Sequence, residues 1–302
     1  MEYPYRYETH LHTKQSSACS SCLAQDYIEL YQKAGYTGII VTDHFYHGNS
    51  GIPRNLSWRD WVDRFALGYE DAKREGDKRG FQVFFGWEEN FDGDEYLIYG
   101  LSKEWLYEHE EVKTWTQEEQ FQKVQEAGGL VVQAHPFRER DYLSKIHLHP
   151  TCVHAMEVAN SGNLDFMDAN AYEYCRKNHI IMTAGSDMHH AKDVSSRCFG
   201  MAFSKPLESI HDYVSRIKEA KNKVEKEKFL MNEKLAMKEK LLMKEELLKK
   251  EMSLIKENPQ GNNAENNEML ELLEKDQNRC LITTKDRWEI RVTPKLPIFE
   301  YK

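Results

Sequence analysis

Histidine and carboxylate residues recur in this sequence directly after short apolar runs. His10 and His12 follow the first such run, and residues i and i+2 of a strand project to the same side, so both imidazoles can bind one ion. The later members of the set are His44, Glu88, His135, Asp187 and His189. Imidazole with carboxylate suits zinc, manganese or iron, and seven such groups exceed the needs of one four-coordinate ion. The sequence therefore predicts two or three divalent metal ions.

A cluster of divalent ions predicts a hydrolytic reaction. Such ions lower the pKa of a coordinated water to near neutrality and polarise a phosphoryl or carbonyl oxygen for attack. A bridging carboxylate is the natural way to hold two ions close together, and Glu88 or Asp187 could serve. A single buried histidine could instead be a hydrogen-bonded structural residue. Core packing does not explain, however, why so many apolar runs end in polar groups that would all need partners.

The apolar runs alternate with helix-like segments. The runs are rich in β-branched or aromatic residues and lie at 37–42, 81–87, 130–134, 153–159, 180–185 and 199–203. The helix-like segments are 25–34, 58–79, 116–127 and 164–178, with Ser57 as an N-cap and a capping box at Thr116. Strands that alternate with helices predict a parallel sheet, either open or closed into a barrel.

The positions of the metal-type residues favour the barrel. In a βα-barrel the active site forms at the carboxyl ends of several strands, whereas an open sheet concentrates its site at one switch point. Here at least five strand ends contribute, and no glycine-rich nucleotide-binding motif follows the early strands. We therefore expect an α/β fold with an irregular barrel over residues 1–212.

The C-terminal part of the chain departs from this alternation. Residues 213–257 are dense in Lys and Glu, with Leu and Met recurring every three or four positions, which predicts a long amphipathic helix. We expect a charged helical insertion and polar linker over 213–267, followed by a helix and strands over 268–302 that complete or flank the barrel. The insertion either extends a barrel connection as a helical hairpin or forms a coiled coil that mediates self-association.

Composition argues against several classes of protein. The net charge of −9 over 302 residues disfavours a broad nucleic-acid-binding face. Residues 1–7 lack the apolar core of a signal peptide, and no stretch is long and apolar enough to span a bilayer, so we expect a cytoplasmic protein without membrane contact. Cys19 and Cys22 have CxxC spacing, but a zinc ribbon would need a second such pair. Two ordinary loop residues are the better interpretation.

Six short motifs, in this order, resemble the PHP (polymerase and histidinol phosphatase) family. They are Thr9-His10-Leu11-His12-Thr13, Thr42-Asp43-His44, Gly86-Trp87-Glu88, Ala134-His135-Pro136, Glu157-Val158-Ala159-Asn160 and Gly185-Ser186-Asp187-Met188-His189. The ordered set, over residues 5–205, is far more specific than any one motif. The resemblance implies a distorted seven-stranded TIM-like βα-barrel with up to three zinc, manganese or iron ions at the strand ends. It also implies hydrolysis of phosphomonoesters, or of phosphodiesters in nucleotides and nucleic acids.

The resemblance further implies a division of the ligands among three ions. The first ion would take His10, His12, Glu88 and Asp187 as ligands. Glu88 would bridge to a second ion, which His135 also holds. His44 and His189 would hold the third.

The chain departs from the family pattern at two places. Many relatives complete the third site with an Asp or His after the first motif, where this chain reads Lys14-Gln15-Ser16-Ser17-Ala18. Relatives also carry a His before a short apolar run that ends in Gly. Here Asp94 or Glu95 is the candidate oxygen ligand in its place.

Other residues are expected to bind substrate or to orient the ligands. Because Arg suits bidentate contact with phosphate oxygens, basic residues near the motifs are candidates for substrate binding. These candidates are Arg138, Arg197 and Lys14. Asp43 is expected to orient His44 rather than to bind metal. Glu157 and Asn160 are expected to support the ligands and line the pocket.

We expect a metal-dependent phosphoesterase that hydrolyses a small phosphomonoester by a metal-activated hydroxide. The alternative substrate is a nucleotide or single-stranded nucleic acid, for which the loop 45–60 offers Arg54, Trp58 and Arg59. The acidic chain disfavours that alternative. A hypothesis of another class is a metal-stabilised, non-catalytic interaction module that uses the long helix.

Overall fold

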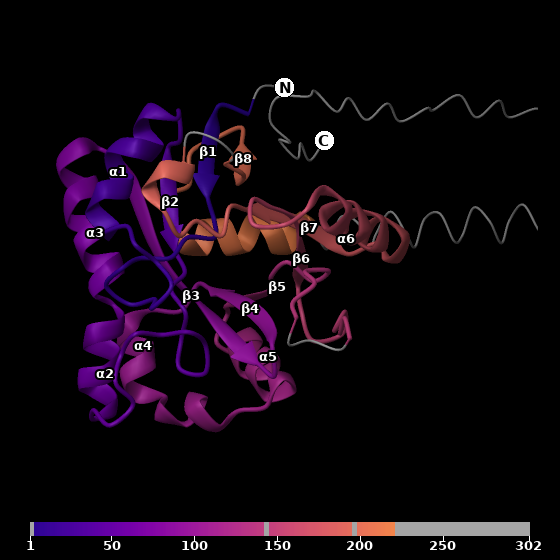
Figure 1. Cartoon of the computed structure of the whole chain (residues 1–302), viewed down its shortest axis with the longest axis horizontal. Coiled ribbons are helices and arrows are strands. Elements are labelled where there is room, and N and C mark those ends of the chain that lie inside the picture. The colour runs from indigo at the N-terminus through magenta and orange to yellow at the C-terminus, as the bar shows by residue number, and fades with distance from the viewer. Residues whose placement is uncertain (1–2, 142–144, 195–197, 221–302) are drawn as a thin grey trace, which may run out of the picture. The chain divides into compact units, whose positions relative to one another are not determined.

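The described part of the chain is a barrel-like mixed sheet with helices between its strands (Figure 1). A computed structural model describes residues 3–141, 145–194 and 198–220. Within them, eight strands form one sheet in the order β7-β6-β5-β4-β3-β2-β1-β8. The strands are β1 Tyr5–Glu8, β2 Gly38–Val41, β3 Gln82–Phe91, β4 Asp94–Tyr99, β5 Leu130–Gln133, β6 Ala155–Asn160, β7 Ile181–Gly185 and β8 Met201–Phe203. The barrel predicted from the sequence is confirmed, with eight strands in place of the seven that the family resemblance implied.

The sheet closes where the segments that follow β1 and β7 meet. His12 N donates a hydrogen bond to Met188 O at 2.9 Å, and Met188 N donates to His10 O at 3.1 Å. The edge strands β7 and β8 are also in contact. This closure brings the first and the last metal-type motif side by side.

The sheet is mixed, which corrects the parallel arrangement predicted from the alternation. β4 runs antiparallel between β3 and β5, and β8 runs antiparallel to β1. β3 and β4 form a hairpin through the two-residue turn Asp92-Gly93, where φ is 52° and 96°. An Asp-Gly pair tolerates such positive φ values, and the resulting turn matches the twist of the paired strands.

Helices lie between the strands and cover the outside of the sheet. They are α1 Ala24–Lys33, α2 Trp58–Phe65, α3 Leu67–Arg79, α4 Lys103–Glu108, α5 Gln117–Glu126 and α6 Asp165–Asn178. The single helix predicted over 58–79 is two helices that meet at Ala66. The expected caps are present, because Ser57 accepts a hydrogen bond from Asp60 N and Thr116 forms a capping box with Glu119.

Side chains alternate along the strands between the inside of the sheet and its helix-covered face. In β4, Leu97 and Tyr99 belong to a cluster with side chains from six other strands and from helical residues 210–220. Tyr96 and Ile98 belong instead to the aromatic cluster that packs beneath α2, α4 and α5. The cluster that contains Leu97 and Tyr99 fills the interior of the barrel. Polar residues lie beyond it, at the carboxyl ends of the strands.

No helix in the three described ranges is long and apolar enough to cross a membrane. Of the predicted insertion, only residues 213–220 fall within these ranges, where they are helical. The remainder of 213–267, the segment 268–302 and their expected role in self-association lie outside the described residues.

Candidate metal centre

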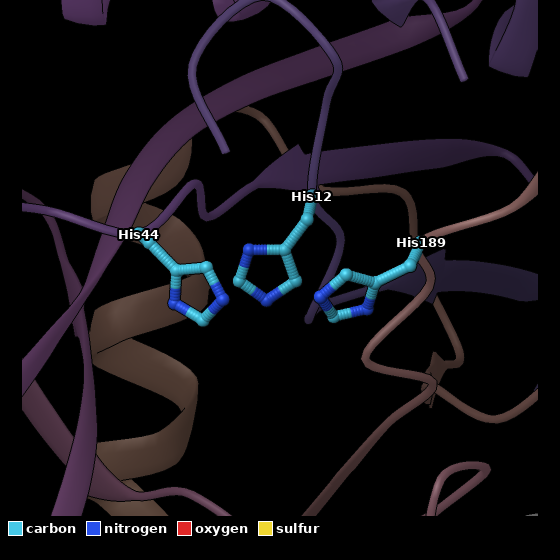
Figure 2. A group of neighbouring side chains, drawn as sticks. All are labelled: His12, His44 and His189. Atoms are coloured by element: carbon cyan, nitrogen blue, oxygen red, sulfur yellow. The ribbon is translucent and has the colours of Figure 1, made fainter. Parts of the chain in front are cut away.

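The seven predicted ligands converge at one end of the barrel. They come from five strands or the segments that follow them: His10 and His12 after β1, His44 after β2, Glu88 within β3, His135 after β5, and Asp187 and His189 after β7. Their ligand atoms form overlapping groups whose members all lie within 4.8 Å of one another. Figure 2 shows the imidazoles of one such group, His12, His44 and His189, aligned with His12 in the middle.

One pair of histidines and one pair of carboxylates point at a common position. His10 Nε2 lies 3.1 Å from Glu88 Oε1 and 3.4 Å from Asp187 Oδ1. His12 Nε2 lies 3.0 Å from Asp187 Oδ1 and 3.4 Å from Glu88 Oε2. The two Nε2 atoms are 3.1 Å apart. Four side chains at this spacing match the coordination shell of one small divalent ion.

Strand pairing fixes the position of His44 relative to Glu88. The chain after β2 continues alongside β3, so that Glu88 N donates to Asp43 O at 3.0 Å and Phe45 N donates to Glu88 O at 2.7 Å. His44 and Glu88 are thereby paired directly across the two strands. The backbone hydrogen bonds between the two strands therefore continue into the centre and fix the positions of His44 and Glu88.

Glu157 supports two of the histidine ligands from β6. Its Oε1 accepts from His10 Nδ1 at 3.0 Å, and its Oε2 accepts from His135 N at 3.1 Å. Asn160 Nδ2 donates to the same Oε2 at 2.7 Å. With Nδ1 of His10 occupied in this way, Nε2 is the nitrogen that faces the centre.

Ser17 and Asp43 form a second supporting group. The Ser17 hydroxyl donates to Asp43 Oδ1 at 2.6 Å and accepts from His12 Nδ1 at 3.2 Å and from His44 N at 3.0 Å. Asp43 also accepts from Thr13 N and Thr13 Oγ1, at 2.6 and 2.7 Å. Asp43 thus acts on His44 and His12 through Ser17, a residue that no sequence motif pointed to.

The buried ligands set one another's charge. Burial raises the pKa values of Glu88 and Asp187, but His10 nearby holds both well below their usual range. Burial lowers the pKa of His12, and His44 and His189 lower it further. Burial also lowers the pKa of His10, but the adjacent carboxylates outweigh this and raise it well above its usual value. The centre therefore pairs ionised carboxylates with imidazoles, the residue types that bind divalent cations.

Two buried atoms of the centre lack hydrogen-bond partners among the described residues. His44 Nδ1 and Glu88 Oε2 lie 2.8 Å apart, yet neither makes a hydrogen bond of acceptable geometry. Buried polar atoms without partners cost free energy in a protein interior. A cation ligated by both atoms would remove this cost, so these residues fit a metal ion.

Glu95, rather than Asp94, lies at the centre. Glu95 Oε2 is 3.3 Å from His135 Nε2, and Glu95 forms a group with His44 and Glu88 within 4.8 Å. Asp94 instead accepts from His149 Nε2 at 3.1 Å, away from this group. The alternation of side chains along β4 separates these neighbours, so only one of the two candidates can face the centre.

The three basic residues predicted to bind the substrate differ in their surroundings. Arg138 donates to Asp187 Oδ2 at 2.6 Å, and also to Asn160 Oδ1 and Asn163 Oδ1. Lys14 is exposed, and its ammonium group makes no ion pair with the described residues. Arg197 lies outside the described residues. A pocket beside the centre is lined by the cationic side chains Arg138, Arg140 and Lys145 together with the carboxylates Asp94 and Glu95, and Arg140 is paired with Glu95.

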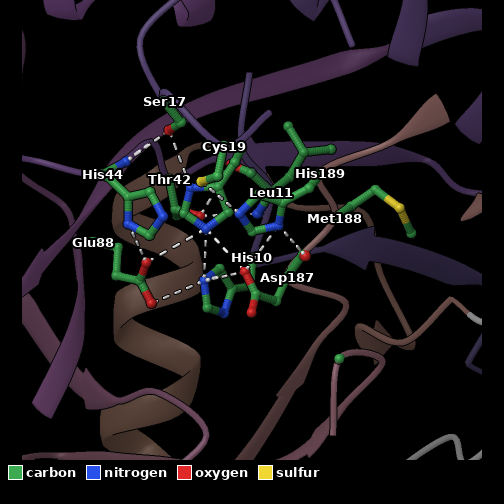
Figure 3. A network of polar contacts seen from close by, with 12 residues as sticks. His10, Leu11, Ser17, Cys19, Thr42, His44, Glu88, Asp187, Met188 and His189 are labelled. Atoms are coloured by element: carbon green, nitrogen blue, oxygen red, sulfur yellow. Dashed lines mark hydrogen bonds and ion pairs between the residues drawn. The ribbon is translucent and has the colours of Figure 1, made fainter. Parts of the chain in front are cut away.

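Cys19 also lies at the centre, against the expectation of an ordinary loop residue. Its Sγ is 3.1 Å from His189 Nε2 (Figure 3). Burial raises the pKa of the thiol, but the hydrogen bond with His189 and the interaction with His44 lower it to about 6. Cys22 does not share this environment, because its thiol contacts Leu23 O and burial raises its pKa to about 11.

Two residues of the centre have left-handed backbone conformations. φ is 28° at His135 and 55° at Asp187. Such a conformation costs a residue with a side chain on the order of 1–3 kcal/mol, and it persists where the surrounding structure enforces it. Here it turns both ligands toward the centre directly after their strands.

Comparison with known proteins finds distant structural likenesses. A two-domain protein from Bacteroides vulgatus that contains a predicted PHP-like metal-dependent phosphoesterase matches 63% of this chain with 15% identity and a TM-score of 0.49, and this chain covers 53% of it, about half its length. A candidate metal-dependent phosphoesterase from Bifidobacterium adolescentis matches 62% of the chain, and 89% of its own, with 15% identity and a TM-score of 0.44.

A third solved structure is an amidohydrolase from Chromobacterium violaceum with bound sulfate. It matches 70% of this chain, and 96% of its own, with 12% identity and a TM-score of 0.43. No protein-family model and no curated protein matches the chain significantly. At TM-scores below 0.5 these likenesses say nothing about activity, so the function must be inferred from the centre itself.

Proposed function

We propose that this protein is a metal-dependent phosphoesterase that hydrolyses a small phosphomonoester. The observation that carries the proposal is the convergence of seven metal-type side chains from five strands at one end of the barrel. A set of this size suits two or three divalent zinc, manganese or iron ions. The resemblance of the sequence motifs to the PHP family supports the same assignment.

The residues that would hold the ions divide into three overlapping groups. His10, His12, Glu88 and Asp187 surround one position, Glu88 and His135 flank a second, and His44 and His189 a third. When bound, the ions would supply water activation and would stabilise the charge of the phosphoryl group during its transfer. Glu88 would be the bridging ligand, because its carboxylate lies within 3.5 Å of nitrogens from His10, His44 and His135.

The pocket beside the centre supports an anionic substrate. Lys145 and Arg140 line this pocket together with His135, Arg140 being paired with Glu95, and Arg138 reaches from the same pocket to Asp187. Fixed positive charge at this place would bind phosphate oxygens and orient the ester toward the metal ligands. Arg138, with three side-chain acceptors already engaged, keeps Asp187 in position rather than leaving its donors free for substrate.

The loop 45–60 gives less support to a nucleic-acid substrate. Trp58 is buried, and its Nε1 donates to Leu106 O, so its ring is not open to a stacked base. The Arg54 guanidinium donates to three carbonyl groups of its own loop. We therefore keep the small phosphomonoester as the proposed substrate, with nucleotides as the second series to assay.

The proposal is tested by elemental analysis of the full chain purified without chelator, together with hydrolysis of an aryl phosphate with and without added Mn²⁺. We expect two or three ions per chain and turnover that requires them. Glu88→Gln should lose metal and lower turnover by more than about 100-fold, since residues that only orient ligands already account for up to that much. Glu173→Gln on the exposed face of α6 is the control. Absence of stoichiometric metal, without turnover on addition of Mn, Zn or Fe, would overturn the proposal.

A further inference from the structure

The thiol of Cys19 is the one sulfur atom that the described structure places against the histidines of the centre. Its Sγ lies 3.1 Å from His189 Nε2, and it interacts with His44 as well. His44 and His189 belong to the group whose ligand atoms lie within 4.8 Å of one another. The cysteine therefore lies beside a cluster of ligand atoms that has metal-binding spacing without it.

The loop that carries Cys19 is held on both sides of this residue. Ala18 N donates to Asn49 O at 2.9 Å. On the other side, Ser20 Oγ lies 2.9 Å from His12 O and 3.0 Å from His189 O, and Ser21 N donates to His189 O at 3.0 Å. These contacts tie the loop to the backbone of two proposed ligands, so the position of Sγ is set by the centre itself.

The other nitrogen of His189 is already committed. Its Nδ1 donates to the backbone oxygen of Asp187 at 2.7 Å. In its neutral form a histidine that donates from Nδ1 carries a lone pair on Nε2, the atom nearest to the Cys19 sulfur. Sulfur and nitrogen thus present two electron-pair donors to one space, which is how ligands of a shared ion are arranged.

We propose that Cys19 is a thiolate ligand of the ion that His44 and His189 bind. In a tetrahedral zinc site the Zn–S and Zn–N lengths place sulfur and nitrogen about 3.5 Å apart, so a small outward shift from 3.1 Å admits the ion. Binding exchanges the S–H proton for the metal, and the proton leaves to solvent. This inference rests on the proposed function, because it adds a ligand to the same centre.

A thiolate ligand changes which metal the position favours. Sulfur is a soft donor that favours zinc and related ions over manganese, whereas the positions around Glu88 and Asp187 offer oxygen and nitrogen only. The third position is therefore selective for a softer ion than its neighbours. Cys22, three residues later, has its thiol against Leu23 O and takes no part.

Cobalt substitution of the full chain tests this ligand directly. Visible ligand-field absorption reports Co²⁺ anywhere in the centre, whereas a near-ultraviolet thiolate-to-cobalt charge-transfer band appears only if sulfur is bound. We expect both in the wild type and in the control Cys22→Ser. Cys19→Ser should keep the visible bands and lose the charge-transfer band, and Cys19→Asp, which replaces sulfur by oxygen, should do the same.

A second measurement needs no variant. Metal should slow alkylation of Cys19 by iodoacetamide at least about tenfold, as followed by peptide mass spectrometry, and leave Cys152, which lies outside the centre, unchanged. Visible bands and metal-dependent turnover without a charge-transfer band or protection would overturn the thiolate ligand alone. Absence of cobalt binding and of turnover would overturn the proposed function and this inference with it.

Discussion

Each of three histidines in the centre commits one ring nitrogen to a protein acceptor. The acceptors are Glu157 for His10, Ser17 for His12 and the Asp187 backbone for His189. Because Nδ1 is occupied in every case, Nε2 is the nitrogen that faces the other ligands. The orienting residues therefore decide the ligand geometry as much as the histidines do.

Replacing Glu157 by Gln should weaken metal binding by about 10–100-fold without removing a ligand. The amide would keep one oxygen for His10 Nδ1, but its NH₂ group would face the donors His135 N and Asn160 Nδ2. Competition of the protein with a chelating dye for Zn²⁺ measures the change. Glu173→Gln serves as the surface control, and equal affinities in the two variants would show that Glu157 does not position the ligands.

The proposed metal ligands could be predicted from the sequence, but not all of the residues that hold them in position. His10, Glu88 and Asp187 were predictable because each follows an apolar run, and the barrel brings strand ends together. Ser17 and Cys19 lie in an irregular loop whose path depends on distant hydrogen bonds to Asp43 and Asn49. No local pattern encodes such long-range contacts, so a CxxC spacing was the only sign of Cys19.

At the scale of elements, the end of β7 must pass very close to the first ligand. A Cβ atom added to Gly185 would lie 2.5 Å from His10 Cβ and 2.7 Å from Glu157 Oε1. Only glycine lets the strand approach the β1 segment closely enough for the hydrogen bonds that Met188 makes with His10 and His12. The position of the end of β7 therefore requires a residue without a side chain at position 185.

Gly185→Ala should displace His10 from its partners, and it should lower the free energy of unfolding by about 1–3 kcal/mol, the usual cost of overpacking. Zinc affinity should fall together with stability, because the same atoms support both. Denaturant unfolding and metal titration of the full chain measure the two effects. Gly51→Ala, whose added Cβ would meet only ordinary contacts at 3.7–3.8 Å, is the control. A variant that unfolds and binds zinc like this control would contradict the steric argument.

The antiparallel strand β4 was not predicted, although the sequence contains a signal for it. The pair Asp92-Gly93 between two apolar runs is a strong hairpin indication. A βα alternation leads to the expectation of a helix after each strand, and that expectation outweighed the turn. The error also hid the orientation of Glu95, which follows once the strand's alternation is known.

At the scale of the whole molecule, the centre is also the point where the barrel closes. The β1 and β7 segments meet through His10, His12 and Met188, and the buried carboxylates Glu88 and Asp187 lie against the same junction. Among the described residues, nearby imidazoles and Arg138 offset their charges. Metal should therefore stabilise the fold as well as serve the reaction.

We expect Zn²⁺ or Mn²⁺ at 100 times its dissociation constant to add about 2.7 kcal/mol per site to the stability, which corresponds to a rise of about 5–10 °C in Tm. The rise should disappear with excess chelator and should be much smaller in Glu88→Gln, which has lost the bridging carboxylate. Thermal unfolding followed by circular dichroism measures it. An unchanged Tm in saturating metal would show that the centre does not bind ions in the folded state. A full rise in Tm without turnover on any phosphate ester would instead favour a metal-stabilised interaction module over an enzyme.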